Sequence, residues 1–110
     1  MSQQGLATVV KSLAAVLERL VRPRRKVLVL DCDNTLWGGV LGEDGVDGIT
    51  LGEDGIGAAY LDFQRAAKRL ARNGVLLAIA SKNNEPEVWE VFERHPSMVL
   101  ERADIVSSKI

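Results

Sequence analysis

The sequence has few of the residues on which several classes of protein depend. Its 110 residues contain a single cysteine, Cys32, so a disulfide within the chain is excluded and a reducing compartment is favoured. Residues 1–5 lack the basic start of a signal peptide, and Lys11, Glu18 and Arg19 interrupt the apolar stretch that follows. No segment reaches the roughly 18 uninterrupted apolar residues of a membrane span. We therefore expect a cytoplasmic protein with no membrane partner.

The chain also lacks an excess of charge of either sign. Lys and Arg total 14 against 15 Asp and Glu, which gives a net charge of −1. One basic cluster stands out, at residues 22–26, and no aromatic residues interleave with it. A solvated linker is a better interpretation of that cluster than a nucleic-acid patch. Nucleic acid is therefore not an expected partner.

The most informative stretch is residues 26–37, where four apolar residues run directly into Asp31 and Asp33. An apolar run without alternation is typical of a strand covered on both faces, as in a parallel sheet between layers of helices. A chain of 110 residues has room for one such domain. Residues two apart in an extended chain point the same way, so the two carboxylates should converge. Their mutual repulsion predicts a compensating cation, for which Mg²⁺ is the simplest candidate.

The rest of the chain predicts a βαβ arrangement. An amphipathic helix is expected over 6–21 and a basic linker up to 25, ahead of an α/β domain over 26–110. The glycine-rich segment 38–51 predicts a small β-hairpin flap over the site. A helix over 58–72, a strand over 75–80 and a helix over 86–94 follow, and apolar pairs at 99–100 and 105–106 mark a third strand. The expected fold is α/β and Rossmann-like, with three layers and a parallel sheet.

The two buried strands end in polar residues of complementary kinds. Parallel strands deliver their carboxyl ends to one edge of a sheet, where open sheets of this type bind ligands. The segment 81–84, Ser-Lys-Asn-Asn, should therefore lie beside Asp31. Turn formation and helix capping are the alternative for these residues, as for the Asp and Asn that follow the first strand. His95, the sole histidine, is expected to cap or to lie on the surface.

Four apolar residues followed by Asp-x-Asp-x-Thr resemble the first signature of the haloacid dehalogenase superfamily. The resemblance implies that Asp31 attacks a phosphoryl group, that Asp33 acts as the acid and base, and that both hold Mg²⁺. It also implies that Ser81 takes the place of the second signature, which hydrogen-bonds the transferring phosphoryl group. The phosphate-binding residues expected on this basis are Asn34, Thr35, Ser81, Lys82 and Asn83.

The match is most similar to the FkbH-like branch of that superfamily. It includes residues 26–40, Gly-Glu-Asp-Gly at 42–45, Phe-Gln at 63–64, Ser-Lys-Asn-Asn at 81–84, and 95–100. The resemblance implies transfer of a glyceryl group from 1,3-bisphosphoglycerate to an acyl carrier protein, with dephosphorylation. The third and fourth signatures are missing, and Lys109 does not match the third-signature lysine. The chain thus looks like the front portion, apparently truncated, of such an enzyme.

Three alternatives remain open at this point. Cys32, between the two carboxylates, is either a catalytic residue that carries the glyceryl group as a thioester or a small buried hydrophobe, because strand alternation turns it away from Asp31. The chain as a whole could also be a non-catalytic module that binds phosphate or a carrier protein. A simple phosphatase of small phosphorylated molecules is the third possibility.

Overall fold

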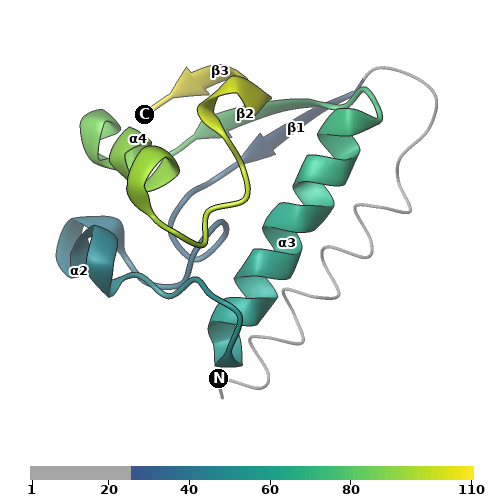
Figure 1. Cartoon of the computed structure of the whole chain (residues 1–110). Helices are drawn as coiled ribbons and strands as arrows, with labels where there is room; N and C mark the ends of the chain where they lie inside the picture. Colours follow the sequence, from purple (N-terminus) through teal and green to yellow (C-terminus); the bar gives the residue numbers. More distant parts are fainter. Residues whose placement is uncertain (1–25) are drawn as a thin grey trace.

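The computed structural model describes residues 26–110 of the chain. The helix expected over 6–21 and the basic linker up to 25 lie outside the described residues. Within the described part, the elements follow in the order β1, α2, α3, β2, α4, η1 and β3 (Figure 1). No helix of residues 26–110 is long and apolar enough to cross a membrane.

Three parallel strands form the sheet. They are β1 (Val27–Leu30), β2 (Leu76–Ala80) and β3 (Ile105–Lys109), in the spatial order β1-β2-β3. Leu30 pairs with Ile79 in the first ladder, and Ala80 pairs with Lys109 in the second, where the register shifts at Leu77 and Ala78. The parallel α/β fold predicted from the two apolar runs is confirmed, and the third strand forms from the later of the two apolar pairs.

Helix α3 (Gly55–Arg72) is the crossover between β1 and β2, and α4 (Glu85–Arg94) leads from β2 to β3. The sequence sets both ends of α4: Asn84 accepts a hydrogen bond from the Glu87 amide at 3.3 Å, and His95 is the C-cap. After α3, Gly74 has a φ of 95°, which glycine adopts at low cost and which ends the helix. The helices thus begin and end close to the predicted residues.

The described helices cover one face of the sheet. Successive right-handed crossovers in the order 1-2-3 place α3 and α4 on the same side, as Figure 1 shows. Leu77 and Ile79 of β2 are buried beneath them, whereas Val27 and Val29 of β1 are 60% and 61% exposed. The sequence predicted cover on both faces; the helices of residues 26–110 cover one, and the helix expected over 6–21 lies outside the described residues. An apolar run alone does not reveal on which side each crossover packs.

The prediction of a β-hairpin flap over residues 38–51 is wrong, because residues Leu41–Gly48 form the helix α2. The Asp44 carboxylate accepts a hydrogen bond from the Val40 amide at 3.0 Å. Glu43 and Asp44 lie in the first turn of α2, where negative charge stabilises a helix. Gly45 has a φ of 72° and kinks the helix. All that remains of the expected antiparallel pairing is one bridge, between Gly38 and Thr50.

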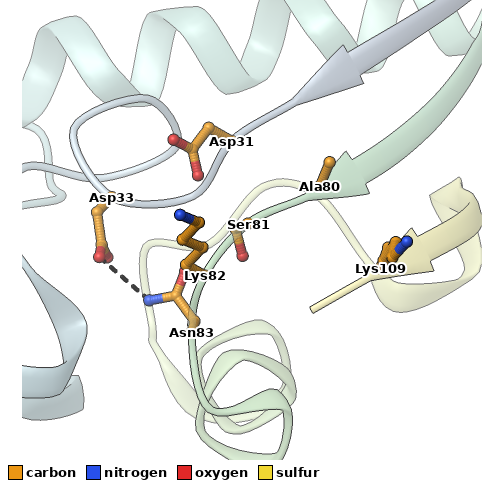
Figure 2. Close-up of a pocket in the computed structure, with 7 residues that line it drawn as sticks. All are labelled: Asp31, Asp33, Ala80, Ser81, Lys82, Asn83 and Lys109. Atoms are coloured by element: carbon orange, nitrogen blue, oxygen red, sulfur yellow. Dashed lines mark hydrogen bonds between the residues drawn. The ribbon is translucent and has the colours of Figure 1, made fainter.

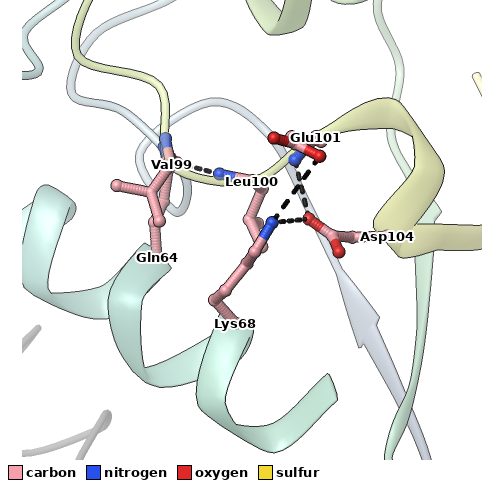
Figure 3. A network of polar contacts seen from close by, with 6 residues as sticks. All are labelled: Gln64, Lys68, Val99, Leu100, Glu101 and Asp104. Atoms are coloured by element: carbon pink, nitrogen blue, oxygen red, sulfur yellow. Dashed lines mark hydrogen bonds and ion pairs between the residues drawn. The ribbon is translucent and has the colours of Figure 1, made fainter. Parts of the chain in front are cut away.

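A buried amide on α3 holds the loop that leads to β3. Gln64 has no exposed surface and donates to the Leu36 carbonyl at 2.7 Å. Its side-chain oxygen accepts from the Val99 and Leu100 amides at 3.0 and 3.2 Å (Figure 3). One turn further along α3, Lys68 pairs with Asp104 at 2.7 Å. Asp104 belongs to the short 3₁₀ helix η1 (Arg102–Asp104). These contacts fix where β3 begins.

Candidate active site

A cavity of about 530 Å³ opens at the carboxyl ends of the three strands. It is lined by residues from all three strand ends, which are Asp31, Asp33, Ala80, Ser81, Lys82, Asn83 and Lys109 (Figure 2). The parallel arrangement therefore brings the two predicted carboxylates to the same cavity as Ser81, Lys82 and Asn83. Asn34 and Thr35 do not line it.

Asp31 and Asp33 are held in different ways. The Asp31 side chain is exposed and accepts one hydrogen bond, from the backbone amide of Cys32 at 2.7 Å. Asp33 is partly buried: its Oδ1 accepts from the Trp37 indole and the Leu41 amide, both at 3.0 Å, and its Oδ2 accepts from Asn83 Nδ2 at 3.1 Å. Three donors fix the orientation of Asp33, while Asp31 remains accessible from the cavity.

The turn after β1 explains why Asn34 and Thr35 lie outside the cavity. The amides of Thr35 and Leu36 both donate to the Cys32 carbonyl, which curls the chain into a tight turn. Asn34 has a φ of 57°, a left-handed conformation that asparagine tolerates better than most residues. Its side chain accepts from the Gly39 amide at 2.9 Å. In this conformation Asn34 organises the turn, as the alternative interpretation of the sequence allows.

Ser81 lines the cavity, but its hydroxyl faces inward. The oxygen is buried and has no hydrogen-bond partner of good geometry among the described residues. It nevertheless lies close enough to Cys32 to lower the pKa of that thiol. The Ser81 amide donates to the Lys109 carbonyl at 3.0 Å, which continues the β2–β3 ladder. Contact between the hydroxyl and a phosphoryl group would require the side chain to rotate, and the phosphate-binding role of Ser81 stays a prediction.

Cys32 points away from the cavity. Its side chain has no exposed surface and belongs to the hydrophobic core. Burial raises the pKa of the thiol from 9.0 to about 11; the Ser81 hydroxyl opposes this shift, and the charges of Asp31 and Asp33 add to it. A thiol that is neutral and enclosed at pH 7 is a poor nucleophile. The geometry therefore favours the buried hydrophobe over the thioester carrier, and the catalytic role of Cys32 stays a prediction.

The two carboxylates fit part of a Mg²⁺ site. Oxygen is the ligand that Mg²⁺ prefers, and Asp31 and Asp33 present carboxylate oxygens to one cavity. Within residues 26–110, no group of three or more His, Cys, Asp and Glu gathers in a metal-binding arrangement. Any further ligands from this part of the chain would have to be backbone carbonyls, amide side chains or water, and Mg²⁺ commonly keeps several waters.

Two residues at the site, one that lines the cavity and one beneath it, were not anticipated from the sequence. Lys109 lines the cavity because β3 pairs with β2 in a register that brings it beside Ala80. That register includes a shift at Leu77 and Ala78, for which the sequence carries no visible signal. Trp37 supports the site from within the core through its bond to Asp33. The i, i+4 spacing of Asp33 and Trp37 was a hint of this contact.

The chain resembles a solved structure in both sequence and fold. No family model matches the chain, and neither does any curated protein. The chain is similar to a crystal structure of the N-terminal part of the protein BF1531 from Bacteroides fragilis, described as containing a phosphatase domain complexed with Mg. The two are 42% identical, with a TM-score of 0.75. They share a fold. The match covers 92% of this chain and 26% of the other, so the chain spans about a quarter of the length of that relative.

Proposed function

We propose that the chain carries the catalytic nucleophile and the metal-binding carboxylates of a Mg²⁺-dependent phosphatase. The observation that supports this most directly is the meeting of Asp31 and Asp33 with Ser81, Lys82 and Asn83 at one cavity. The similarity to a structure described as a phosphatase domain complexed with Mg supports the same reaction and metal. The sequence signature around Asp31 is a third argument.

The residues divide the chemistry between them. The accessible Asp31 carboxylate attacks phosphorus and forms an aspartyl-phosphate, while the bond from phosphorus to the leaving oxygen breaks. Asp33 protonates the leaving oxygen, and then takes a proton from the water that hydrolyses the aspartyl-phosphate. In Figure 2 the Lys82 side chain is directed toward the space between Asp31 and Asp33, where its charge can offset that of a phosphoryl group. Mg²⁺ held by the two carboxylates would neutralise charge on the phosphoryl oxygens.

A more specific form of this proposal is the FkbH-type reaction, in which a glyceryl group passes from 1,3-bisphosphoglycerate to an acyl carrier protein. Only the sequence resemblance supports it, and the acyl acceptor and its docking surface are not apparent in residues 26–110. The non-catalytic phosphate-binding module is the competing function. The two differ in whether Asp31 forms a covalent bond with phosphorus.

The decisive variant is Asp31→Asn, which preserves size and removes the nucleophile. We expect phosphate release from p-nitrophenyl phosphate with Mg²⁺ to fall to background, and Asp33→Asn to lower it by roughly 10²–10⁴-fold. Asp54→Asn is the matched control, because Asp54 is an exposed carboxylate at the start of α3 that makes no side-chain cap. Hydrolysis is measured by absorbance with the chain in excess over trace phosphatase contaminants.

Metal binding gives a second readout that does not depend on turnover. Addition of Mg²⁺ should shift the amide resonances of residues 31–33 and 81–83 in the wild type and in Asp54→Asn, and should not do so in Asp31→Asn/Asp33→Asn. Unchanged hydrolysis in Asp31→Asn would exclude the proposed nucleophile. Mg²⁺ binding without any hydrolysis would instead support the non-catalytic module.

A further inference from the structure

The cavity carries two lysines at well-separated positions. Lys82 is directed toward the two carboxylates, whereas Lys109 stands on the far side of the cavity, beyond Ala80 (Figure 2). Within the described part of the chain, no ion pair joins either lysine to a carboxylate. Two lysines that form no ion pair in the described part of the chain therefore face one cavity from different strand ends.

The sheet fixes where Lys109 lies. Ala80 pairs with Lys109, and Leu30, the residue before Asp31, pairs with Ile79, the residue before Ala80. Asp31, Ala80 and Lys109 thus continue one row across the sheet edge. Strands lie about 4.8 Å apart, so the Cα atoms of Asp31 and Lys109 are separated by roughly 10 Å. The hydrogen bond from the Ser81 amide to the Lys109 carbonyl holds the backbone in this position.

The middle residue of this row leaves space between the two charged ones. Ala80 carries only a methyl group, and residues in register on neighbouring parallel strands share a face of the sheet. A larger side chain at position 80 would fill the floor of the cavity between Asp31 and Lys109. The space suits the carbon skeleton of a small substrate that runs along the row with one end at each charged residue.

We propose that Lys109 is a specificity residue that binds a second anionic group of the substrate. In this arrangement the phosphoryl group is held at Asp31 and Lys82, and a carboxylate or second phosphate on the same small molecule is held by the Lys109 ammonium. The proposal rests on the phosphatase function above and narrows its substrate class to phosphorylated metabolites with two anionic groups. A charge-assisted contact of this kind should raise the affinity roughly ten-fold or more.

The test compares ligands that differ at the second group. Dissociation constants for glycerol 3-phosphate, 3-phosphoglycerate and glycerol 1,3-bisphosphate are measured with Mg²⁺ by NMR titration of the 110-residue chain. We expect the wild type to bind one of the two bis-anionic ligands at least about ten-fold more tightly than glycerol 3-phosphate. Which of them is preferred tells whether the second group is a carboxylate or a phosphate.

Variants assign the preference to Lys109. Lys109→Ala should bring the dissociation constant for glycerol 3-phosphate close to that for the preferred bis-anionic ligand. Lys109→Arg should restore most of the difference between the two constants. Arg72→Ala is the control for loss of one positive charge, because exposed Arg72 ends α3 at the opposite edge of the sheet. If the wild type shows no preference, or if Lys109→Ala retains it, the proposal is wrong. If glycerol 3-phosphate and the bis-anionic ligands all fail to bind, the proposed phosphatase function fails as well.

Discussion

At the scale of single residues, the site depends on which way each side chain turns at the end of a strand. Asp31 and Lys109 line the cavity, whereas Cys32, the residue after Asp31, lies in the core. Alternation along the chain thus places an exposed carboxylate and a buried thiol one peptide unit apart. The chemistry of this segment is set by orientation as much as by residue type.

Cys32 should titrate late and affect stability at alkaline pH. Its folded pKa of about 11 lies above the ordinary value of 9.0, so the folded state retains the proton that the unfolded state loses. The resulting stability is fully present below about pH 9 and is lost as the pH rises toward 11. Urea unfolding from pH 7 to 11 should therefore show a smaller alkaline loss for Cys32→Ala than for the wild type.

Tyr60 should also lower stability at alkaline pH, because burial raises the pKa of its phenol. Some loss of stability should accordingly persist in Cys32→Ala. Alkylation by iodoacetamide gives an independent check: at pH 8 the folded chain should react far more slowly than the same chain in urea. Rapid alkylation of the folded chain would show that the thiol is accessible. That result would support the role of Cys32 as a thioester carrier.

At the scale of elements, α3 holds the β3 side of the site in place through Gln64. Truncation to alanine would leave the Leu36 carbonyl and the Val99 and Leu100 amides buried without their partner. Each unsatisfied group costs about 1–3 kcal/mol, so Gln64→Ala should lower the free energy of unfolding by roughly 3 kcal/mol or more. Chemical denaturation measures the difference.

The neighbouring Arg65 provides the contrast for that experiment. Its ion pairs with Glu53 and Asp62 lie on the surface, and such pairs contribute about 0–1 kcal/mol. Arg65→Ala should therefore unfold within about 1 kcal/mol of the wild type. Equal losses for the Gln64 and Arg65 variants would mean that the buried amide does not organise the loop.

The elements also show where sequence reasoning succeeds and where it does not. Strands β1 and β2 were predictable because their apolar runs are unbroken, and the polar residues at their ends were therefore assigned to one edge. Helix α2 was not predictable in this way, because hydrogen bonds from the backbone to two carboxylates determine where it starts. Asp33 accepts from the Leu41 amide, and Asp44 accepts from the Val40 amide. Lys109 reached the cavity through a register shift that only the paired strands reveal.

At the scale of the whole molecule, the two faces of the sheet differ. The face under α3 and α4 contains Leu77, with no exposed surface, whereas Val29 on β1 is 61% exposed. The hydrophobic core of the described residues is therefore built on one side of the sheet, from the helices and the turn after β1. The opposite face contributes much less buried apolar surface to the stability of the described fold.

A pair of substitutions measures this asymmetry. Val29→Thr should change the free energy of unfolding by no more than about 0.5 kcal/mol, as expected for a surface position. Leu77→Ala should cost about 2–5 kcal/mol, because it removes a large side chain from the core. Thermal or urea unfolding of both variants provides the comparison. A loss of more than 1 kcal/mol in Val29→Thr would show that this face is covered in solution.

The hydrogen bond between Trp37 and Asp33 makes Trp37 an intrinsic fluorescence probe of the site. The indole has no exposed surface, yet its Nε1 donates to a carboxylate that lines the cavity. Any event that redistributes charge on Asp33 will therefore change the emission of a chromophore shielded from solvent quenchers. The second indole, Trp89, lies under the Arg102 guanidinium at 4.4 Å and donates to Glu85. Fluorescence of a Trp89→Phe variant would then report occupancy of the site without any added dye.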